Sequence, residues 1–312
     1  MTWRAWLAFV ALSVIWGVPY FFIKLALEEI PPVGVAWSRI ALGAAILLPV
    51  AWKRGTLRSA ASHKIAICAF AIIELVIPFV LIAQGERWIS SSLTGILIAT
   101  VPLAVVILAP LFGVHESLGP RRLVGLAIGF IGVVALLGID PVGGWREWFG
   151  VGCILVATLG YAIGPLIVER YLVGVDELAS VAASLVVGTI VLLPAVVLAV
   201  PAKPLSFTAL SSIAVLGIGC TALGLWIYFF LIAEAGAARA SVVTYVNPAI
   251  AALLGVLVLS EPFGVGSAVG FALILFGSWL STSRAEKRTE PISSRHAAPE
   301  GTHVYRDVQL PD

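Results

Sequence analysis

Three ionisable side chains lie inside long apolar runs of this sequence. Glu74 lies about nine residues from either end of the run Ile65–Gly85, or ~14 Å along a helix, whereas Arg39 and Lys24 lie nearer the ends of their runs. Ionisable groups in such surroundings are costly, so each is a candidate functional residue. Arg39 and Lys24 could bind a ligand carboxylate, and Glu74 could bind an amine or take up a proton. Alternatively, Arg39 and Glu74 neutralise each other and Lys24 extends to the membrane surface.

Aromatic side chains supply a second set of candidates. Trp16, Tyr20 and Lys24 recur every four residues and therefore share one helix face. Tyr161 lies beside Gly160 and Gly164 in a later apolar run. Such rings could line a pocket that stacks flat or amphipathic ligands, although many Trp and Tyr residues in membrane proteins are interfacial anchors.

A third set of candidates lies near the C-terminal end of the apolar region. Tyr245 and Asn247 place a phenol and an amide beside Pro248, and Trp226 lies in the run before them. Asn247 could bind a ligand, or it could satisfy the helix turn that the proline breaks. Packing is the alternative for Trp226.

The composition shows which medium surrounds these residues. The 312 residues are 60% hydrophobic and 12% charged, whereas soluble domains are about 25% charged, so a cytosolic enzyme is excluded. The net charge of +2 offers no basic surface for nucleic acid. A bilayer core takes about 20 apolar residues per helix. Ten segments fit this length: Trp6–Leu25, Val33–Trp52, Ile65–Gly85, Ser92–Phe112, Leu123–Ile139, Phe149–Val168, Leu178–Val200, Ala209–Ala233, Ala240–Leu259 and Val265–Ser281.

The segments repeat. At a shift of about 145 residues Trp16 falls on Tyr161, Gly43 on Gly188, Pro49 on Pro194 and Glu116 on Glu261. Five spans per half is an odd number, so the second half must be inverted relative to the first. The prediction is an all-α polytopic membrane protein with ten transmembrane helices in two inverted five-helix repeats, 1–140 and 141–282. In secondary carriers of this kind the substrate lies near the midplane between the halves.

The flanking regions set the expected orientation. Lys and Arg gather in the loops on the side of the N-terminus, which favours both termini in the cytoplasm. The residues 283–312 are rich in polar and charged types and are expected to form a disordered cytoplasmic tail. The expected location is a cytoplasmic (inner) membrane.

The repeated motifs resemble a known family. The chain is similar to EamA-type drug/metabolite transporters in three features: Trp16-Gly17 with Lys24, then Arg39, and a Pro followed by Glu and Gly that occurs twice. The two copies of the last pattern read Pro102, Glu116, Gly125 and Pro248, Glu261, Gly270. The resemblance implies a ten-helix carrier that moves small metabolites, amino acids or drugs, commonly outward. The two glutamates precede helix starts, so they are interpreted as helix caps.

Other function classes lack their motifs. No Gly-Lys pair exists, so there is no P-loop, and neither HExxH nor GxSxG occurs. No cofactor or metal is expected, and the three cysteines read as core residues. We therefore expect a secondary carrier whose partners are a small-molecule substrate, lipid and coupling protons. Its longest inner loop, Lys53–Lys64, offers no substantial element on which an ATPase could dock. The alternatives are a membrane-embedded transferase or hydrolase and a permease subunit. A homodimer through glycine-bearing helix faces is the alternative to close packing within one chain.

Overall fold

The computed structural model describes residues 2–113, 119–139, 143–172, 174–199, 204–235 and 243–282, which form helices joined by turns and loops and contain no strand. Eight helical stretches within them are long and apolar enough to cross a membrane, and they match the first eight expected spans. The last two expected spans correspond to shorter apolar helices, Val246–Val258 and Val265–Ser281. The helical class is confirmed, whereas the count of ten spans stays a prediction.

The first half of the chain, residues 1–140, is a series of helices in which several spans are divided. Their bounds are α1 (Trp3–Gly17), α2 (Pro19–Ala26), α3 (Pro32–Lys53), α4 (Leu57–Ala61), α5 (Lys64–Phe70), the π-helical η1 (Ala71–Val76), α6 (Ile77–Gly85), α7 (Ser91–Ile98), α8 (Val101–Leu108), the 3₁₀-helical η2 (Ala109–Phe112) and α9 (Pro120–Ile139).

The second half, residues 141–282, is built in the same way. Its bounds are α10 (Trp145–Tyr171), α11 (Glu177–Val197), α12 (Phe207–Ala214), the π-helical η3 (Val215–Leu223), α13 (Gly224–Ala235), α15 (Val243–Val258) and α16 (Val265–Thr282).

Proline explains where several first-half spans are divided. Pro19 starts α2 after α1 ends, and Pro102 stands in the first turn of α8 after α7 ends. Pro78 follows η1 and has no N–H to donate to the preceding turn, so the backbone there widens to a π-helix. The second half has its π-helix η3 at the equivalent place, about 145 residues after η1.

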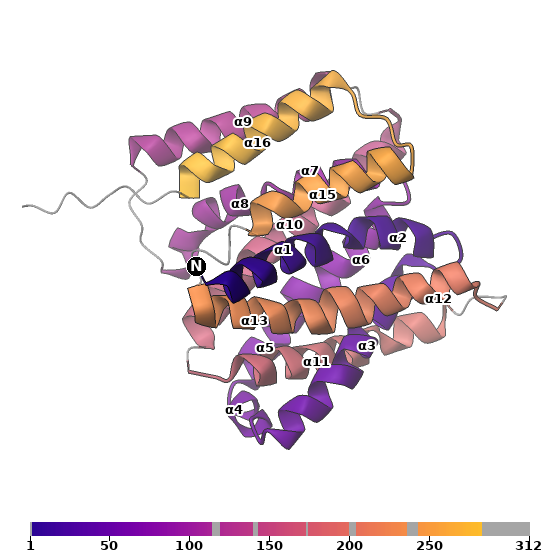
Figure 1. The fold of residues 1–312 in the computed structure, drawn as a ribbon, viewed down its shortest axis with the longest axis vertical. Helices are drawn as coiled ribbons and strands as arrows, with labels where there is room; N and C mark the ends of the chain where they lie inside the picture. Colours follow the sequence, from indigo (N-terminus) through magenta and orange to yellow (C-terminus); the bar gives the residue numbers. More distant parts are fainter. Residues whose placement is uncertain are drawn as a thin grey trace, which may run out of the picture.

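Helices that the repeat relates pack against each other. Trp37 near the start of α3 donates from Nε1 to the backbone oxygen of Thr189 at 3.1 Å. Gly43, later in α3, faces Leu185, which comes earlier in α11. Because residue numbers rise along one helix as they fall along the other, α3 and α11 are antiparallel. Figure 1 shows this pair at the bottom of the bundle.

The pair α9 and α16 lies side by side at the opposite edge of the bundle (Figure 1). Gly125 approaches backbone atoms of Ser281 and Gly277, and Gly132 approaches those of Gly270 and Ile274, so this pair is antiparallel too. A side chain at Gly125 or Gly132 would collide with backbone. The glycine faces therefore serve close packing within one chain, as expected, and not a free dimer surface.

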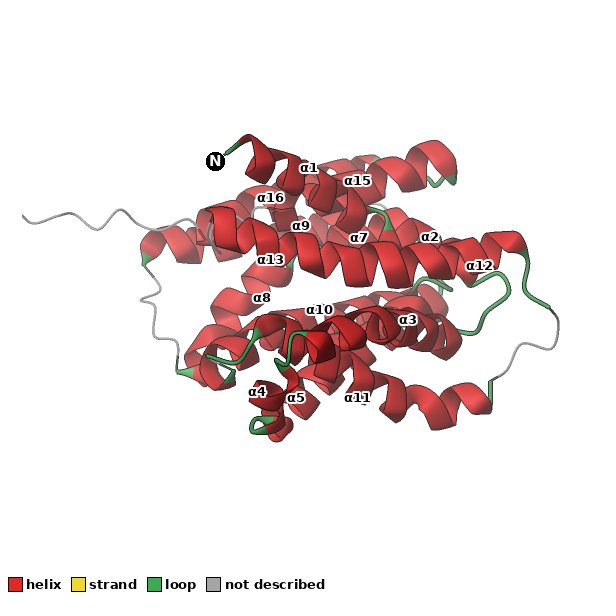
Figure 2. Ribbon diagram, turned by 60° about the horizontal axis from the view of Figure 1, so that its bottom comes forward, coloured by secondary structure: helices red, strands yellow, loops and turns green. Residues whose placement is uncertain are grey.

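The bundle has two ends, and the N-terminus lies at one of them. The N-terminus lies at one end, called the proximal end, as does the turn after α3; the loops from α2 to α3 and into α12 lie at the other, the distal end (Figure 2). Many large apolar side chains point outward, among them Phe130 and Ile131 of α9, with 69% and 57% of their surface exposed. Such an apolar exterior suits lipid.

Candidate functional site

Arg39 is a buried cation in the middle of the bundle. It is 9% exposed, and its guanidinium carbon lies 3.9 Å from the centre of the Phe79 ring. Its Nε donates to Thr221 Oγ1 at 3.0 Å, which joins α3 of the first half to η3 of the second. Among the described residues no carboxylate lies within ion-pair distance of Arg39, and only Nε has a hydrogen-bond partner. Arg39 and Glu74 therefore do not form the ion pair that was one interpretation of the sequence.

Glu74 lies in η1 and faces α10 of the second half. Its Oε2 is buried and has no hydrogen-bond partner among the described residues. The carboxylate fills the space beside Gly164, and the backbone oxygen of Ile73 reaches Gly160. Side chains at these two glycines would collide with the π-helix. The glycines therefore allow the π-helix, with its acidic residue, to pack directly on α10.

Two tyrosines lie near these ionisable residues, Tyr20 near Arg39 and Tyr161 near both Arg39 and Glu74. Tyr20 of α2 is 9% exposed and lies close enough to Arg39 and Glu86 to interact electrostatically with both. Tyr161 of α10 lies close enough to Arg39, Tyr20 and Glu74 to interact electrostatically with them. Its ring packs edge to face on Phe79 with the ring centres 6.5 Å apart. The structure thus brings Tyr20, Arg39, Glu74 and Tyr161 together, and with Thr221 these residues form what we call the central cluster.

Trp16 borders the central cluster. Its Nε1 donates to the backbone oxygen of Cys220 in η3 at 3.0 Å, and its ring lies 5.0 Å from that of Tyr228. Cys220 itself is close enough to Arg39 to interact electrostatically with the guanidinium. Trp16 therefore holds α1 against the π-helix of the second half.

Two further candidates, Trp226 and Asn247, lie apart from the central cluster. Trp226 is 62% exposed on the apolar exterior of α13. Asn247, with its amide nitrogen facing the carbonyls, donates to the backbone oxygens of Ser13 at 3.2 Å and Val243 at 3.0 Å, so it satisfies backbone groups. The side chain of Tyr245 lies outside the described part of the chain.

Lys24 and Glu86 form the next polar group toward the distal end. Lys24 Nζ donates to the backbone oxygens of Glu86 at 2.6 Å and Ile89 at 2.9 Å, so it caps the end of α6 and does not extend freely to the surface. The Glu86 side chain is 0% exposed. Sequence reasoning did not single out Glu86, because it follows an apolar run beside Arg87 and Trp88 and resembles an ordinary loop residue.

Glu261 links the halves at the distal end. Its carboxylate accepts from Ser91 N at 2.7 Å, Ser92 N at 2.9 Å and Ser92 Oγ at 2.6 Å. Partial burial works to raise the pKa of this carboxyl, but the hydrogen bonds from Ser92 and Ser91 outweigh burial and hold the pKa below its usual range. Glu261 is thus a helix cap, as expected, but it caps α7 of the other half and not the helix that follows it. Its repeat partner Glu116 lies outside the described residues.

Glu29 makes a second link at the same end. Its Oε2 accepts from the backbone N–H of Ser206 at 2.7 Å, at the start of α12. Hydrogen bonding to Ser206 lowers the pKa of the Glu29 carboxyl. Each half therefore offers a loop carboxylate to the N-terminus of a helix in the other half. We call these two contacts, Glu29 with Ser206 and Glu261 with Ser91 and Ser92, the distal bridges.

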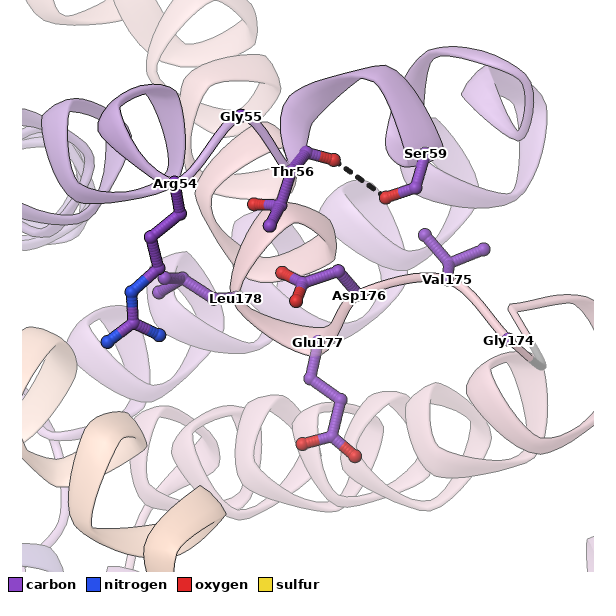
Figure 3. Close-up of a pocket in the computed structure, with 9 residues that line it drawn as sticks. All are labelled: Arg54, Gly55, Thr56, Ser59, Gly174, Val175, Asp176, Glu177 and Leu178. Carbon is purple, nitrogen blue, oxygen red and sulfur yellow. Dashed lines mark hydrogen bonds between the residues drawn. The ribbon is translucent and has the colours of Figure 1, made fainter.

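The proximal end has an open depression instead. Two loops, one from each half, form its walls (Figure 3). Asp176 Oδ1 accepts from Ala179 N at 2.8 Å and so caps its own helix α11, and Ser59 Oγ donates to Thr56 O within the other loop. None of the central cluster lines this depression. The lining residues are Arg54, Gly55, Thr56, Ser59, Gly174, Val175, Asp176, Glu177 and Leu178.

Comparison with known proteins decides the family. The model of the EamA-like transporter family matches residues 3–138 and again residues 148–283. This chain belongs to the EamA-like transporter family. An uncharacterized transporter of Archaeoglobus fulgidus is 24% identical over 277 residues, which cover 89% of this chain and 98% of that protein. The Escherichia coli K12 inner membrane transporter YedA, also uncharacterized, is 26% identical over 286 residues, or 88% of this chain and 89% of YedA.

The fold is shared as well. A solved crystal structure covers 90% of this chain and 97% of its own with a TM-score of 0.64 at 19% identity. At that identity the likeness shows the fold alone. Together with the apolar helices, family membership makes the EamA-like chain a multi-pass membrane protein of a transporter family, and the relatives reported above are named transporters.

Proposed function

We propose that this chain is a secondary carrier that exports a small metabolite, an amino acid or a drug-like compound across the cytoplasmic membrane. One observation carries the proposal: within the described part of the chain, a buried guanidinium without a carboxylate partner and a buried carboxylate oxygen without a donor lie in one cluster between the two halves. A buried charge without a partner is costly, and a ligand of complementary charge would remove that cost.

The central cluster suits a ligand with both an anionic and a cationic or hydrogen-bonding group. The two terminal nitrogens of Arg39 can donate to a carboxylate in parallel. Glu74 can accept from an amine, and Tyr20 and Tyr161 present ring faces and hydroxyls between them. Lys24 is engaged by the carbonyls of Glu86 and Ile89, so we place it at the edge of this site and not among the direct ligands.

Alternating access by two inverted repeats is the proposed mechanism. The antiparallel packing of α3 on α11 and of α9 on α16 supports it, because helices related by an inverting twofold axis meet in opposite directions. The matched π-helices η1 and η3 agree with the same symmetry. The halves would then rock about the central cluster, with both termini in the cytoplasm, the distal end facing outward and protons as the coupling ion.

The state described here then has its outer end closed. The distal bridges join the halves at that end, whereas the loops of the two halves border an open depression at the proximal end. A carrier that takes its substrate from the cytoplasm would start its cycle from such an arrangement.

Reconstitution tests the function and the site together. Strains that express the protein are first screened for tolerance to amino acids, purines and toxic analogues, and a hit is then followed in liposomes with an imposed proton gradient. We expect counterflow without ATP, and we expect Arg39→Gln and Glu74→Gln each to reduce transport about tenfold or more, because each leaves a ligand charge unpaired.

The outcomes distinguish a wrong substrate site from a wrong carrier function. Trp226→Phe, on the apolar exterior, is the matched control and should transport like the wild type. If Arg39→Gln and Glu74→Gln also transport normally, the central cluster is not the substrate site. Conversion of a lipid or precursor by the purified protein would contradict the carrier itself.

A further inference from the structure

Glu86 is the most completely buried ionisable side chain near the distal end. It follows α6 directly and is 0% exposed. Both of its carboxylate oxygens are buried, and neither has a hydrogen-bond partner in the described chain. An ionised carboxylate normally accepts several hydrogen bonds when it is removed from water. The geometry therefore suits the neutral acid and not the anion.

The charged groups around Glu86 come from several elements. Lys24 and Tyr20 face it from α2, Arg39 from α3 and Glu261 from the loop before α16, while Ser91 and Ser92 begin α7 next to Glu261. Lys24 uses its ammonium hydrogens on the backbone oxygens of Glu86 and Ile89, and no ion pair joins it to the Glu86 carboxylate within the described residues.

Glu261 favours the neutral acid further. It is itself held as an anion by the hydrogen bonds from Ser91 and Ser92, and two anionic carboxylates in one buried region repel each other. Burial raises the pKa of Glu86 well above its ordinary value; Lys24 opposes this effect, and Glu261 adds to it. Burial and Glu261 thus favour a protonated Glu86 beside the distal bridge, against the opposing effects of Lys24 and Arg39.

We propose that Glu86 is the proton-binding residue of the outer gate. The gate is the set of distal bridges. In the closed gate Glu86 carries a proton; when the gate opens, the proton passes from the carboxyl oxygen to outer water and leaves a hydrated carboxylate. The gate closes again only after the carboxylate takes up a proton from outside. This inference rests on the proposed carrier function and adds to it the residue at which pH acts.

The direction of the pH effect follows from this scheme. Protons bind the closed state, so a low external pH favours the closed gate and a high external pH favours the open gate. Glu86→Gln is uncharged at every pH and imitates the protonated acid. It should therefore favour the closed gate at every pH and open at a low rate that does not depend on the charge of residue 86.

A native thiol can report on the gate. Cys220 is 2% exposed and precedes Thr221 of the central cluster in η3, so we expect reagents to reach it from outside only when the gate is open. In a Cys68→Ala, Cys153→Ala background, the membrane-impermeant cation MTSET is added to the outside of right-side-out vesicles over a range of external pH. The rate of Cys220 labelling in this background with Glu86 intact is divided by the rate in the same background with Glu86→Gln. This ratio removes the pH dependence of the thiol's own reactivity.

We expect this ratio to rise by up to about tenfold per pH unit until Glu86 is fully ionised, because one proton controls the opening. Glu28→Gln is the matched control: Glu28 is exposed in the distal loop, and its variant should label like the parent. A ratio that does not change with pH overturns the role of Glu86. If Cys220 is labelled from neither side of the membrane under any condition, the proposed alternating access fails instead.

Infrared spectroscopy of the purified protein gives a readout that is independent of transport. A buried neutral carboxylic acid has a C=O stretching band separate from that of carboxylates. We expect such a band in the wild type, a loss of part of its intensity in Glu86→Gln, because the buried Glu74 can contribute to the same band, and no loss in Glu28→Gln. Its persistence at full strength in Glu86→Gln would show that Glu86 does not carry the proton, whatever the protein transports.

Discussion

Trp16 shows how single residues hold the two halves together at the centre. Its indole N–H reaches a backbone oxygen of the π-helix η3, at Cys220, where the widened backbone changes the usual pattern of helical hydrogen bonds. The sequence placed Trp16 in a ligand pocket beside Tyr20, but it contained no information about which carbonyl the indole would meet.

Replacement of Trp16 by Phe removes this hydrogen bond and keeps most of the ring. We expect a loss of about 1 kcal/mol in the free energy of unfolding, because the Cys220 oxygen loses its partner. Denaturant titration in detergent measures the change. Trp226→Phe removes an indole N–H from an exposed ring and should change stability by much less; equal effects of both variants would contradict the role given to Trp16.

The sequence predicted part of the central cluster for physical reasons that remain valid. Arg39 and Glu74 stand out in apolar runs because lipid makes ionisable groups costly wherever they lie. Their partners could not be found in the same way. Thr221 and Phe79 are ordinary residues of their helices, and Glu86 is buried only because distant elements cover the end of α6.

At the scale of the elements, carboxylates stabilise helix starts across the boundary between the halves. Glu261 caps α7, although 160 or more residues separate it from Ser91 and Ser92. A glutamate before a helix indicates a cap, but local sequence predicts only the neighbouring helix as its target. The division of spans was more predictable, since Pro19, Pro78 and Pro102 lie at or beside the breaks. The π-helix η3 contains no proline, and no sequence signal indicated it.

Replacement of Glu261 by Gln should destabilise the protein by about 0.5–2 kcal/mol, the usual range for a lost cap. Because the pKa of Glu261 is lowered in the folded protein, its stabilising effect is present above the ordinary carboxyl pKa and is lost as the pH falls through the lowered value. Thermal unfolding of both proteins over an acidic pH series measures this. The two stability curves should converge at the acidic end, and a constant difference at every pH would contradict the assignment.

For the whole molecule, the repeat explains why polar groups meet at the centre. The pairs α3 with α11 and α9 with α16 lie at opposite edges of the bundle, and each consists of helices about 145 residues apart in sequence (Figure 1). The odd number of expected spans per half predicts inverted repeats, and the antiparallel packing of both pairs agrees with that prediction. The distal bridges were not predictable, since they depend on how the two halves are placed relative to each other.

The inversion can be tested at one pair of equivalent positions. Lys53 ends α3 and Leu198 follows α11, 145 residues later, and both are exposed. In a background without native cysteines, Lys53→Cys and Leu198→Cys should react with a membrane-impermeant maleimide from opposite sides, Lys53→Cys from the cytoplasm. Inside-out and right-side-out vesicles are compared, with full labelling after detergent as the control. Equivalent residues of parallel repeats would react from the same side, and that result would remove the symmetry on which a shared central site and alternating access depend.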